Sequence, residues 1–318
     1  METSRAVDQG VALRANGAVL AMAGVNVIWG VAFPLTKPAL ETIPPFTFAL
    51  LRFTLALAVL LPLARGSAFA LLRGPDGRRL AIAGLLGFCV AQLAQTLALS
   101  LSPASDIAMI ATMTPLWVAL LAWPWLGERL IGRSAVGFVL AIGGLLLIIW
   151  PEGGTSAAAG RRILGDAIFL VNSLAWAAYN VFGRELMARH APLPTTTAAG
   201  LVGTIAIIPF AAGEWLSGRT PSFTPVGLGA VAYTGLLVTV FGFLVLYWAL
   251  GRASAARVAV MMYLQPLAGV LVAWLLLGEP LGGMFLLGAA LVFAGVWLVT
   301  TSPSRHSSSG QSAGASRQ

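Results

Sequence analysis

The chain has very little charge for its length. Only 9% of its 318 residues are Asp, Glu, Lys or Arg, whereas 58% are hydrophobic, and the mean hydropathy is +0.88. Soluble proteins are about 25% charged. The composition therefore excludes a soluble globular domain and predicts an all-α polytopic membrane protein, embedded in the lipid bilayer.

Residues that carry chemistry are also scarce. The single cysteine, Cys89, cannot form an intrachain disulfide, and the only histidines are His190 and His306, outside the apolar runs. No GxSxG elbow, HExxH pair or Cys/His cluster is present. We expect no metal, no cofactor and no hydrolytic activity. The net charge of +8 is spread over isolated arginines, which is typical of membrane orientation signals rather than of nucleic-acid binding.

Ten apolar runs are each near the ~20 residues that a spanning helix needs. They predict helices at 17–36, 46–64, 80–100, 105–126, 134–150, 164–183, 195–213, 226–249, 256–277 and 281–300.

The segments outside these runs predict tails and an orientation. Residues 1–16 are polar and lack the pattern of a signal peptide, and residues 302–318 are rich in Ser and Gly, which predicts a disordered tail. The placement of Arg and Lys favours an orientation in the cell inner membrane with both termini in the cytoplasm. In this orientation fourteen basic residues lie on the cytoplasmic side and four on the outside. The Arg161–Arg162 pair is the one local exception.

An internal duplication organises the chain. Shifted by 151 positions, residues 104–147 align without a gap to residues 255–298, with 16 identities over 44 positions. Pro115 meets Pro266, and Glu128 meets Glu279. Five helices per half is an odd number, so the two copies must cross the membrane in opposite directions, as in inverted-repeat transporters. We expect repeats at 17–151 and 163–301.

Several motifs resemble those of a known family. WGVAF in the first run, PFTFALLRF in the second, and P-L-x-x-x-L-x-A-W-x-x-L-G-E-x-L in each half are similar to EamA-type members of the drug/metabolite transporter superfamily. The resemblance covers nearly the whole chain. It implies a ten-helix, inverted-repeat carrier of small metabolites, often an exporter. The chain also resembles, more loosely, the nucleotide-sugar and organophosphate branches of the superfamily.

Polar and aromatic side chains inside the apolar runs are the candidate substrate-binding residues. They are costly in a membrane unless they bond a neighbouring helix or face a water-filled cavity, and both interpretations stay open for each one. As a set, they predict a central cavity lined by amides, hydroxyls and aromatic rings. The set comprises Asn26, Trp29, Gln92, Gln95, Thr112, Thr114, Trp176, Tyr179, Asn180, Tyr247, Tyr263 and Gln265.

Pro115 and Pro266 interrupt the backbone bonding of equivalent helices, which predicts either packing kinks or hinges that expose the carbonyls of Ala111 and Met262. Arg52 lies within the second run and could snorkel, pair with an acid or bind an anionic substrate.

Other charges and glycines favour structural roles. Asp106 and Asp166 are interpreted as helix-start acids, Lys37 as a helix-end cation, and the Gly–Glu pairs as helix stops. Gly137 and Gly144, like Gly288 and Gly295, form seams for close helix packing, within the chain or between protomers.

The leading hypothesis is a secondary carrier that exports an amino acid or similar zwitterion by alternating access. The alternative is a nucleotide-sugar or phosphate-ester exchanger, which would need several cations at its site. A channel or an intramembrane enzyme is less favoured. No acidic residue lies mid-span, so the sequence leaves proton coupling and facilitated diffusion open, together with the oligomeric state.

Overall fold

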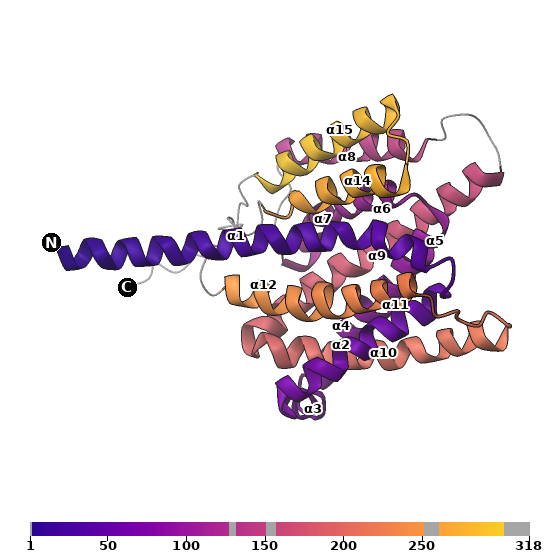
Figure 1. The fold of residues 1–318 in the computed structure, drawn as a ribbon. Helices are drawn as coiled ribbons and strands as arrows, with labels where there is room; N and C mark the ends of the chain where they lie inside the picture. The colour runs from indigo at the N-terminus through magenta and orange to yellow at the C-terminus, as the bar shows by residue number, and fades with distance from the viewer. Residues whose placement is uncertain (1, 127–131, 151–156, 251–260, 302–318) are drawn as a thin grey trace, which may run out of the picture.

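The computed structural model describes residues 2–126, 132–150, 157–250 and 261–301, and within these ranges every regular element is helical. Figure 1 shows a bundle from which the N-terminal part of the first helix projects. The elements are α1 (Glu2–Ala39), α2 (Pro45–Ala64), α3 (Ser67–Arg73), α4 (Gly77–Gly84), η1 (Leu85–Val90), α5 (Ala91–Leu101), α6 (Ala104–Ala111), α7 (Thr114–Leu126), α8 (Gly132–Ile149), α9 (Ala157–Arg189), α10 (Pro192–Leu216), α11 (Pro225–Ala232), η2 (Tyr233–Phe241), α12 (Gly242–Leu250), α14 (Leu264–Leu277) and α15 (Gly283–Thr300).

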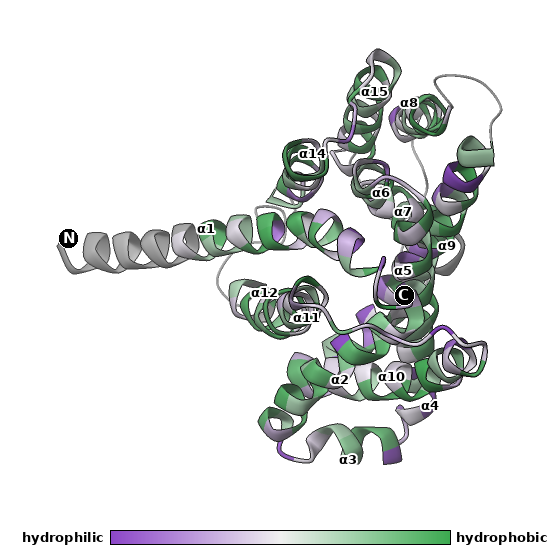
Figure 2. Ribbon diagram, turned by 45° about the vertical axis from the view of Figure 1, so that its right-hand side comes forward, coloured by the Kyte–Doolittle hydropathy of each residue, from purple (hydrophilic) through white to green (hydrophobic). Residues whose placement is uncertain are grey.

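The structure confirms an all-α polytopic membrane protein. Eight helical stretches in the described residues are long and apolar enough to span a bilayer, and α14 is a shorter apolar helix. Most of the helical ribbon is coloured as hydrophobic in Figure 2, and many large apolar side chains are exposed, as lipid contact requires. The exact count of ten spans stays a prediction. The predicted tail at 302–318 lies outside the described residues.

The start of α1 and the connection after α2 differ from the sequence prediction. Helix α1 begins at Glu2 instead of residue 17, because the stretch before Gly17 contains no proline and only one glycine, Gly10. The apolar part that can span a membrane still begins at Gly17. The short helix α3 fills the connection after α2 and was not predicted, since seven residues carry too little periodicity to be recognised.

The glycine seam forms between helices of the same chain. Helices α8 and α15 pack side by side at one edge of the bundle (Figure 1). A β-carbon on Gly144 would lie 2.4 Å from the carbonyl oxygen of Gly288, and one on Gly137 would lie 2.6 Å from that of Gly295. The glycines of the two duplicated segments therefore face each other in crossed pairs, Gly137 with Gly295 and Gly144 with Gly288, and the seam holds the two halves together.

This contact predicts a packing defect from one added side chain. Gly144→Val should destabilise the protein by about 1–3 kcal/mol, because the new side chain would overpack against the backbone of α15. The matched control is Gly143→Val, one residue away, where an added β-carbon meets nothing within 4 Å. Thermal unfolding in detergent measures both variants, and equal midpoints would contradict the seam.

Candidate functional site

Two π-helical segments interrupt long helices inside the bundle. Segment η1 separates α4 from α5, and η2 separates α11 from α12. At the offset of 151 that aligns the duplicated segments, residues 85–90 correspond to residues 236–241, so η1 and η2 are equivalent features. A π-helical turn disturbs the regular backbone pairing of an α-helix and is frequent at functional sites. These segments define the place where a site is built.

Arg52 connects the two segments. Its Nη1 donates to Oε1 of Gln92 at 3.3 Å, and its Nε donates to Oγ1 of Thr239 at 3.3 Å. Gln92 in turn donates to the carbonyl of Gly87 in η1, and Thr239 donates to that of Thr234 in η2. Both side chains thus contact a carbonyl five residues earlier in the chain and present an oxygen to the guanidinium.

The guanidinium is buried without a counter-ion. Arg52 is 8% exposed, and no carboxylate of the described residues lies within ion-pair distance of it. Its two hydrogen bonds are longer than the usual 2.7–3.2 Å range. The guanidinium also lies 4.9 Å from the ring centroid of Phe53. Of the alternatives left open by the sequence, snorkelling and pairing with a described acid are both excluded.

Aromatic rings surround this position. Phe88 of η1 lies at the centre of the cluster, with its ring centroid 5.7 Å from Phe53, 5.5 Å from Tyr179 and 6.3 Å from Trp176. Phe243, just after η2, lies 6.2 Å from Phe88. The result is a buried cation beside an apolar, aromatic wall, as small-molecule sites combine them.

Trp29 of α1 joins the cluster from the other side. Its Nε1 donates to the carbonyl of Val238 in η2 at 2.9 Å, and its ring lies 6.2 Å from that of Phe243. This contact requires glycine at position 242, because a β-carbon there would lie 2.5 Å from the indole nitrogen. The structure therefore brings together four of the predicted residues: Trp29, Gln92, Trp176 and Tyr179.

Other predicted residues bond their own helix or lie elsewhere. The side chains of Asn26, Thr112, Thr114 and Asn180 all donate to carbonyls three or four residues earlier, and not to a neighbouring helix as the structural interpretation expected. Asn26 is nevertheless fully buried, and its Oδ1 has no hydrogen-bond partner among the described residues.

The remaining predicted residues are not part of the Arg52 cluster. The hydroxyl of Tyr263 lies 2.9 Å from that of Thr300, at the α15 side of the bundle. Gln95 and Gln265 are partly buried. The side chain of Tyr247 lies outside the described residues.

The two prolines mark helix breaks instead of mid-helix kinks. Helix α6 ends at Ala111 and α7 begins at Thr114, so Pro115 lies in a first turn, where its missing N–H costs nothing. Likewise, α14 begins at Leu264, just before Pro266. The carbonyls predicted to be exposed are both bonded: that of Ala111 accepts from Thr114 Oγ1, and that of Met262 from the Gln265 N–H. Hinge motion at these breaks stays a prediction.

At one end of the bundle, two carboxylates cap helices that are distant in sequence. Glu279 follows α14 and accepts from the N–H groups of Ala104 and Ser105 at 2.7 and 2.8 Å, and from the Ser105 hydroxyl at 2.7 Å. Glu214 in α10 binds the start of α2 in the same way, through Phe46 and Thr47. We call this the capped end. Gly278 has a φ of 65° and ends α14 as predicted, but Glu279 is more than a helix stop.

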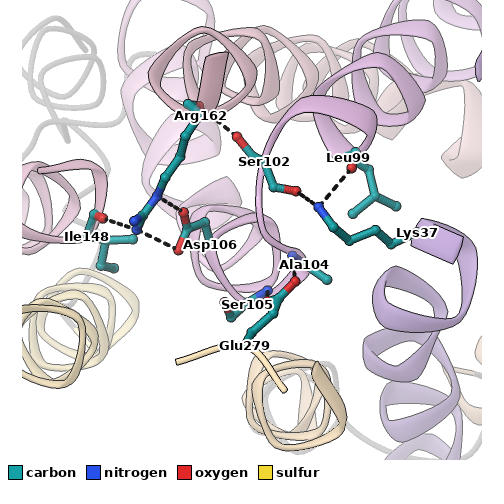
Figure 3. A network of polar contacts seen from close by, with 9 residues as sticks. All are labelled: Lys37, Leu99, Ser102, Ala104, Ser105, Asp106, Ile148, Arg162 and Glu279. Atoms are coloured by element: carbon teal, nitrogen blue, oxygen red, sulfur yellow. Dashed lines mark hydrogen bonds and ion pairs between the residues drawn. The ribbon is translucent and has the colours of Figure 1, made fainter. Parts of the chain in front are cut away.

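An ion pair between a buried carboxylate and a half-buried arginine completes the capped end (Figure 3). Arg162 of α9 contacts both carboxylate oxygens of Asp106 at 2.6 and 3.2 Å and donates to the carbonyl of Ile148 at 2.8 Å. The Ser102 hydroxyl donates to the carbonyl of Arg162 at 2.7 Å, and Lys37 donates to the carbonyl of Ser102. Arg162, the apparent exception to the charge pattern, is thus neutralised within the protein.

The interpretation of Asp166 as a helix-start acid is wrong. Helix α9 begins at Ala157, so Asp166 lies well inside the helix and is fully buried near Ser102. Asp106 does lie in the first turn of α6, as predicted. Sequence hydropathy placed the helix start at residue 164, because the polar residues that precede it hide the earlier turns.

The opposite end carries exposed ion pairs instead. Arg79 and Glu185 form a 3.0 Å pair in which both side chains are 57% exposed. His190 lies 2.9 Å from Asp76, and this hydrogen bond lowers the pKa of Asp76. Because solvent screens such pairs, they stabilise this end of the bundle less than the Arg162–Asp106 pair stabilises the capped end.

The predicted set did not include Phe88, Phe243 or Thr239, and Arg52 had several interpretations. Phe88 and Phe243 looked like ordinary apolar positions, whereas Thr239 was one of several hydroxyl side chains in its apolar run. The available signal was the duplication: the segment around Phe88 and the segment around Thr239 are equivalent at the same offset that aligns the two prolines. π-helical geometry itself has no recognisable sequence pattern.

The structure is a bundle of apolar helices around a buried cation and an aromatic wall, and comparisons with known proteins show that it is a membrane transporter. The model of the EamA-like transporter family matches residues 16–150 and 163–301. The chain therefore belongs to the EamA-like transporter family and is a multi-pass membrane protein.

Relatives cover most of the chain. An uncharacterized transporter of Archaeoglobus fulgidus is 30% identical over 88% of this chain and 96% of that protein. A probable terminal-alkyne amino-acid exporter of Streptantibioticus cattleyicolor is 28% identical over 90% and 94%. A probable amino-acid metabolite efflux pump of Escherichia coli is 29% identical over 86% and 91%. A solved crystal structure with 21% identity shares the fold, with a TM-score of 0.60 over 90% of this chain and 96% of that one.

Proposed function

We propose that the protein is a secondary carrier that exports an amino acid or similar small zwitterion across the cell inner membrane. The observation that carries this proposal is the buried, unpaired Arg52 beside the aromatic cluster of Phe88, Trp176, Tyr179 and Phe243. One cation and an apolar wall suit a small molecule with one anionic group. The relatives described as amino-acid exporters support the same substrate class.

We further propose that the two halves, 17–151 and 163–301, are inverted repeats that alternate around this site, with both termini in the cytoplasm. Two observations support this. The π-helical segments and the proline-linked helix breaks both recur at the offset of 151. At the capped end, Glu279 of the second half binds the start of α6, and Arg162, which directly precedes the second half, pairs with Asp106; we place this end at the extracellular face. Substrate release there requires these contacts to separate.

A phosphate-ester or nucleotide-sugar exchanger fits less well. Such a substrate calls for several cations at one place. Arg52 is the only cation at the described site, since Lys37 is engaged at the capped end by the carbonyls of Leu99 and Ser102. Arg257 lies outside the described residues.

Counterflow in proteoliposomes tests the proposal. Purified protein is reconstituted in vesicles loaded with one unlabelled L-amino acid, and uptake of the labelled form is followed for a panel of amino acids, with and without a pH gradient. We expect saturable exchange of at least one apolar or aromatic amino acid. No saturable flux for any member, against protein-free vesicles, would overturn the substrate class. Dependence on the pH gradient would separate proton coupling from facilitated diffusion.

A further inference from the structure

We infer that Arg52 is the specificity-determining residue of the transport site, that it binds the carboxylate of the substrate, and that the site recognises this group and not the amine. The inference rests on the proposed function, which it sharpens from zwitterions to carboxylates in general. It is carried by the bonding of Arg52, by the position of the rings around it, and by the charges that face it.

The bonding of Arg52 leaves capacity for a ligand. A guanidinium has five N–H donors in a planar fork that matches a carboxylate. In this structure Arg52 makes two hydrogen bonds, both 3.3 Å long and both to neutral oxygens. Burying a charge that only neutral groups contact is costly in a membrane protein, so such residues mark substrate pathways. A substrate carboxylate would supply the missing opposite charge.

The partners of Arg52 keep other hydrogen bonds when the guanidinium binds a substrate carboxylate. Gln92 keeps its hydrogen bond to the Gly87 carbonyl, and Thr239 keeps its bond to the Thr234 carbonyl, when the guanidinium turns toward a ligand. Each side chain therefore retains one hydrogen bond, and the Oε1 atom of Gln92 can keep accepting from Nη1 because the guanidinium has further N–H donors for a ligand. The π-helical segments supply the carbonyls that make this possible.

The rings determine where the rest of the substrate lies. Arg52 is next to Phe53, and Phe53 leads to Phe88, Trp176 and Phe243. A molecule anchored by its carboxylate at Arg52 would place an apolar or aromatic side chain against these rings. Among the described residues no carboxylate accompanies Arg52, so the substrate ammonium has no acid to pair with there. An N-acylated amino acid should therefore bind about as well as the free amino acid.

Competition and binding measurements test this inference. The probe is labelled L-phenylalanine in proteoliposome counterflow, challenged with N-acetyl-L-phenylalanine, which keeps the carboxylate, or L-phenylalaninamide, which lacks it. The same two compounds are tested for thermal stabilisation of the purified protein in detergent. We expect the N-acetyl compound to compete and stabilise, and the amide to do neither.

Arg52→Gln should raise the concentration needed for competition by about 10- to 100-fold, the equivalent of one charge-assisted hydrogen-bonded contact. Arg52→Lys should recover part of it, because the charge returns without the fork. The matched control is Arg73→Gln, an exposed arginine at the end of α3. Folding of the Arg52→Gln protein should persist, since its partners there are neutral, and the unfolding midpoint verifies this.

The outcomes separate the two proposals. Equal competition by the amide, or unchanged affinity in Arg52→Gln, overturns the carboxylate assignment and leaves the transport proposal standing. Carboxylate-dependent stabilisation that is lost in Arg52→Gln, without any flux in the wild type, supports the assignment and overturns the export of amino acids. Neither flux nor stabilisation by either compound overturns both.

Discussion

Arg162→Met is expected to destabilise the protein by up to about 3 kcal/mol, the lower end of the usual cost of removing one partner from a buried ion pair, because the Arg162 side chain is 28% exposed. Asp106 is only 1% exposed, and Arg162 contacts both of its carboxylate oxygens. The substitution leaves a carboxylate buried among apolar helices. It also removes the donor to the Ile148 carbonyl, which loosens the contact between α9 and α8.

The neighbouring arginine provides the control for this experiment. Arg161 is exposed, so Arg161→Met should leave the unfolding midpoint in detergent unchanged. The double variant Asp106→Asn with Arg162→Met should recover most of the lost stability, because no charge is then left unpaired. A double variant as unstable as Arg162→Met alone would show that the ion pair is not the reason for the effect.

Glu279→Ala has the second large expected effect, a loss of about 3 kcal/mol in the free energy of unfolding. Hydrogen bonds to charged groups contribute about 1.5–3 kcal/mol each, but the N–H groups that the truncation uncovers can partly bond to water. The carboxylate accepts three hydrogen bonds at the start of α6 and neutralises the positive end of that helix. Glu279→Gln should lose roughly half as much, because its amide oxygen can still accept while its NH2 group cannot.

Two comparisons make this test specific. Glu214→Ala should behave like Glu279→Ala, since it removes the equivalent cap from α2. Glu41→Gln, an exposed acid at the same end, should change nothing. If Glu279→Ala unfolds at the wild-type midpoint, the glutamate is merely a helix stop at the membrane interface, as its sequence context alone suggested.

These carboxylates show where sequence reasoning reaches its limit. The Gly–Glu ending of the duplicated segment was read as a local signal, and Gly278 does end its helix locally. Glu279, however, caps a helix that begins 175 residues earlier in the chain. A retrospective signal exists, because a Pro-x-Ser/Thr triplet receives each carboxylate, at Pro45–Thr47 and at Pro103–Ser105. The sequence of either triplet does not identify which glutamate binds it.

The candidate site, too, could be predicted from the sequence only in part. Trp29, Gln92, Trp176 and Tyr179 could be predicted, because polar and large aromatic residues inside apolar runs are conspicuous. Thr112, Thr114 and Asn180 were equally conspicuous, yet they bond carbonyls of their own helices. Whether a hydroxyl or amide faces a neighbour, its own backbone or a ligand depends on helix rotation, which hydropathy does not specify.

By itself the sequence determined the class, the family and the duplication, because hydropathy and repeated motifs are properties of the chain that need no coordinates. It also determined that glycines seven residues apart form a seam. Only the tertiary structure decided that this seam joins α8 to α15, that Arg162 neutralises Asp106, and that Arg52 lies unpaired between two π-helical segments. The physical reason is that charge pairing and burial depend on which helices meet, and these contacts join residues far apart in the chain.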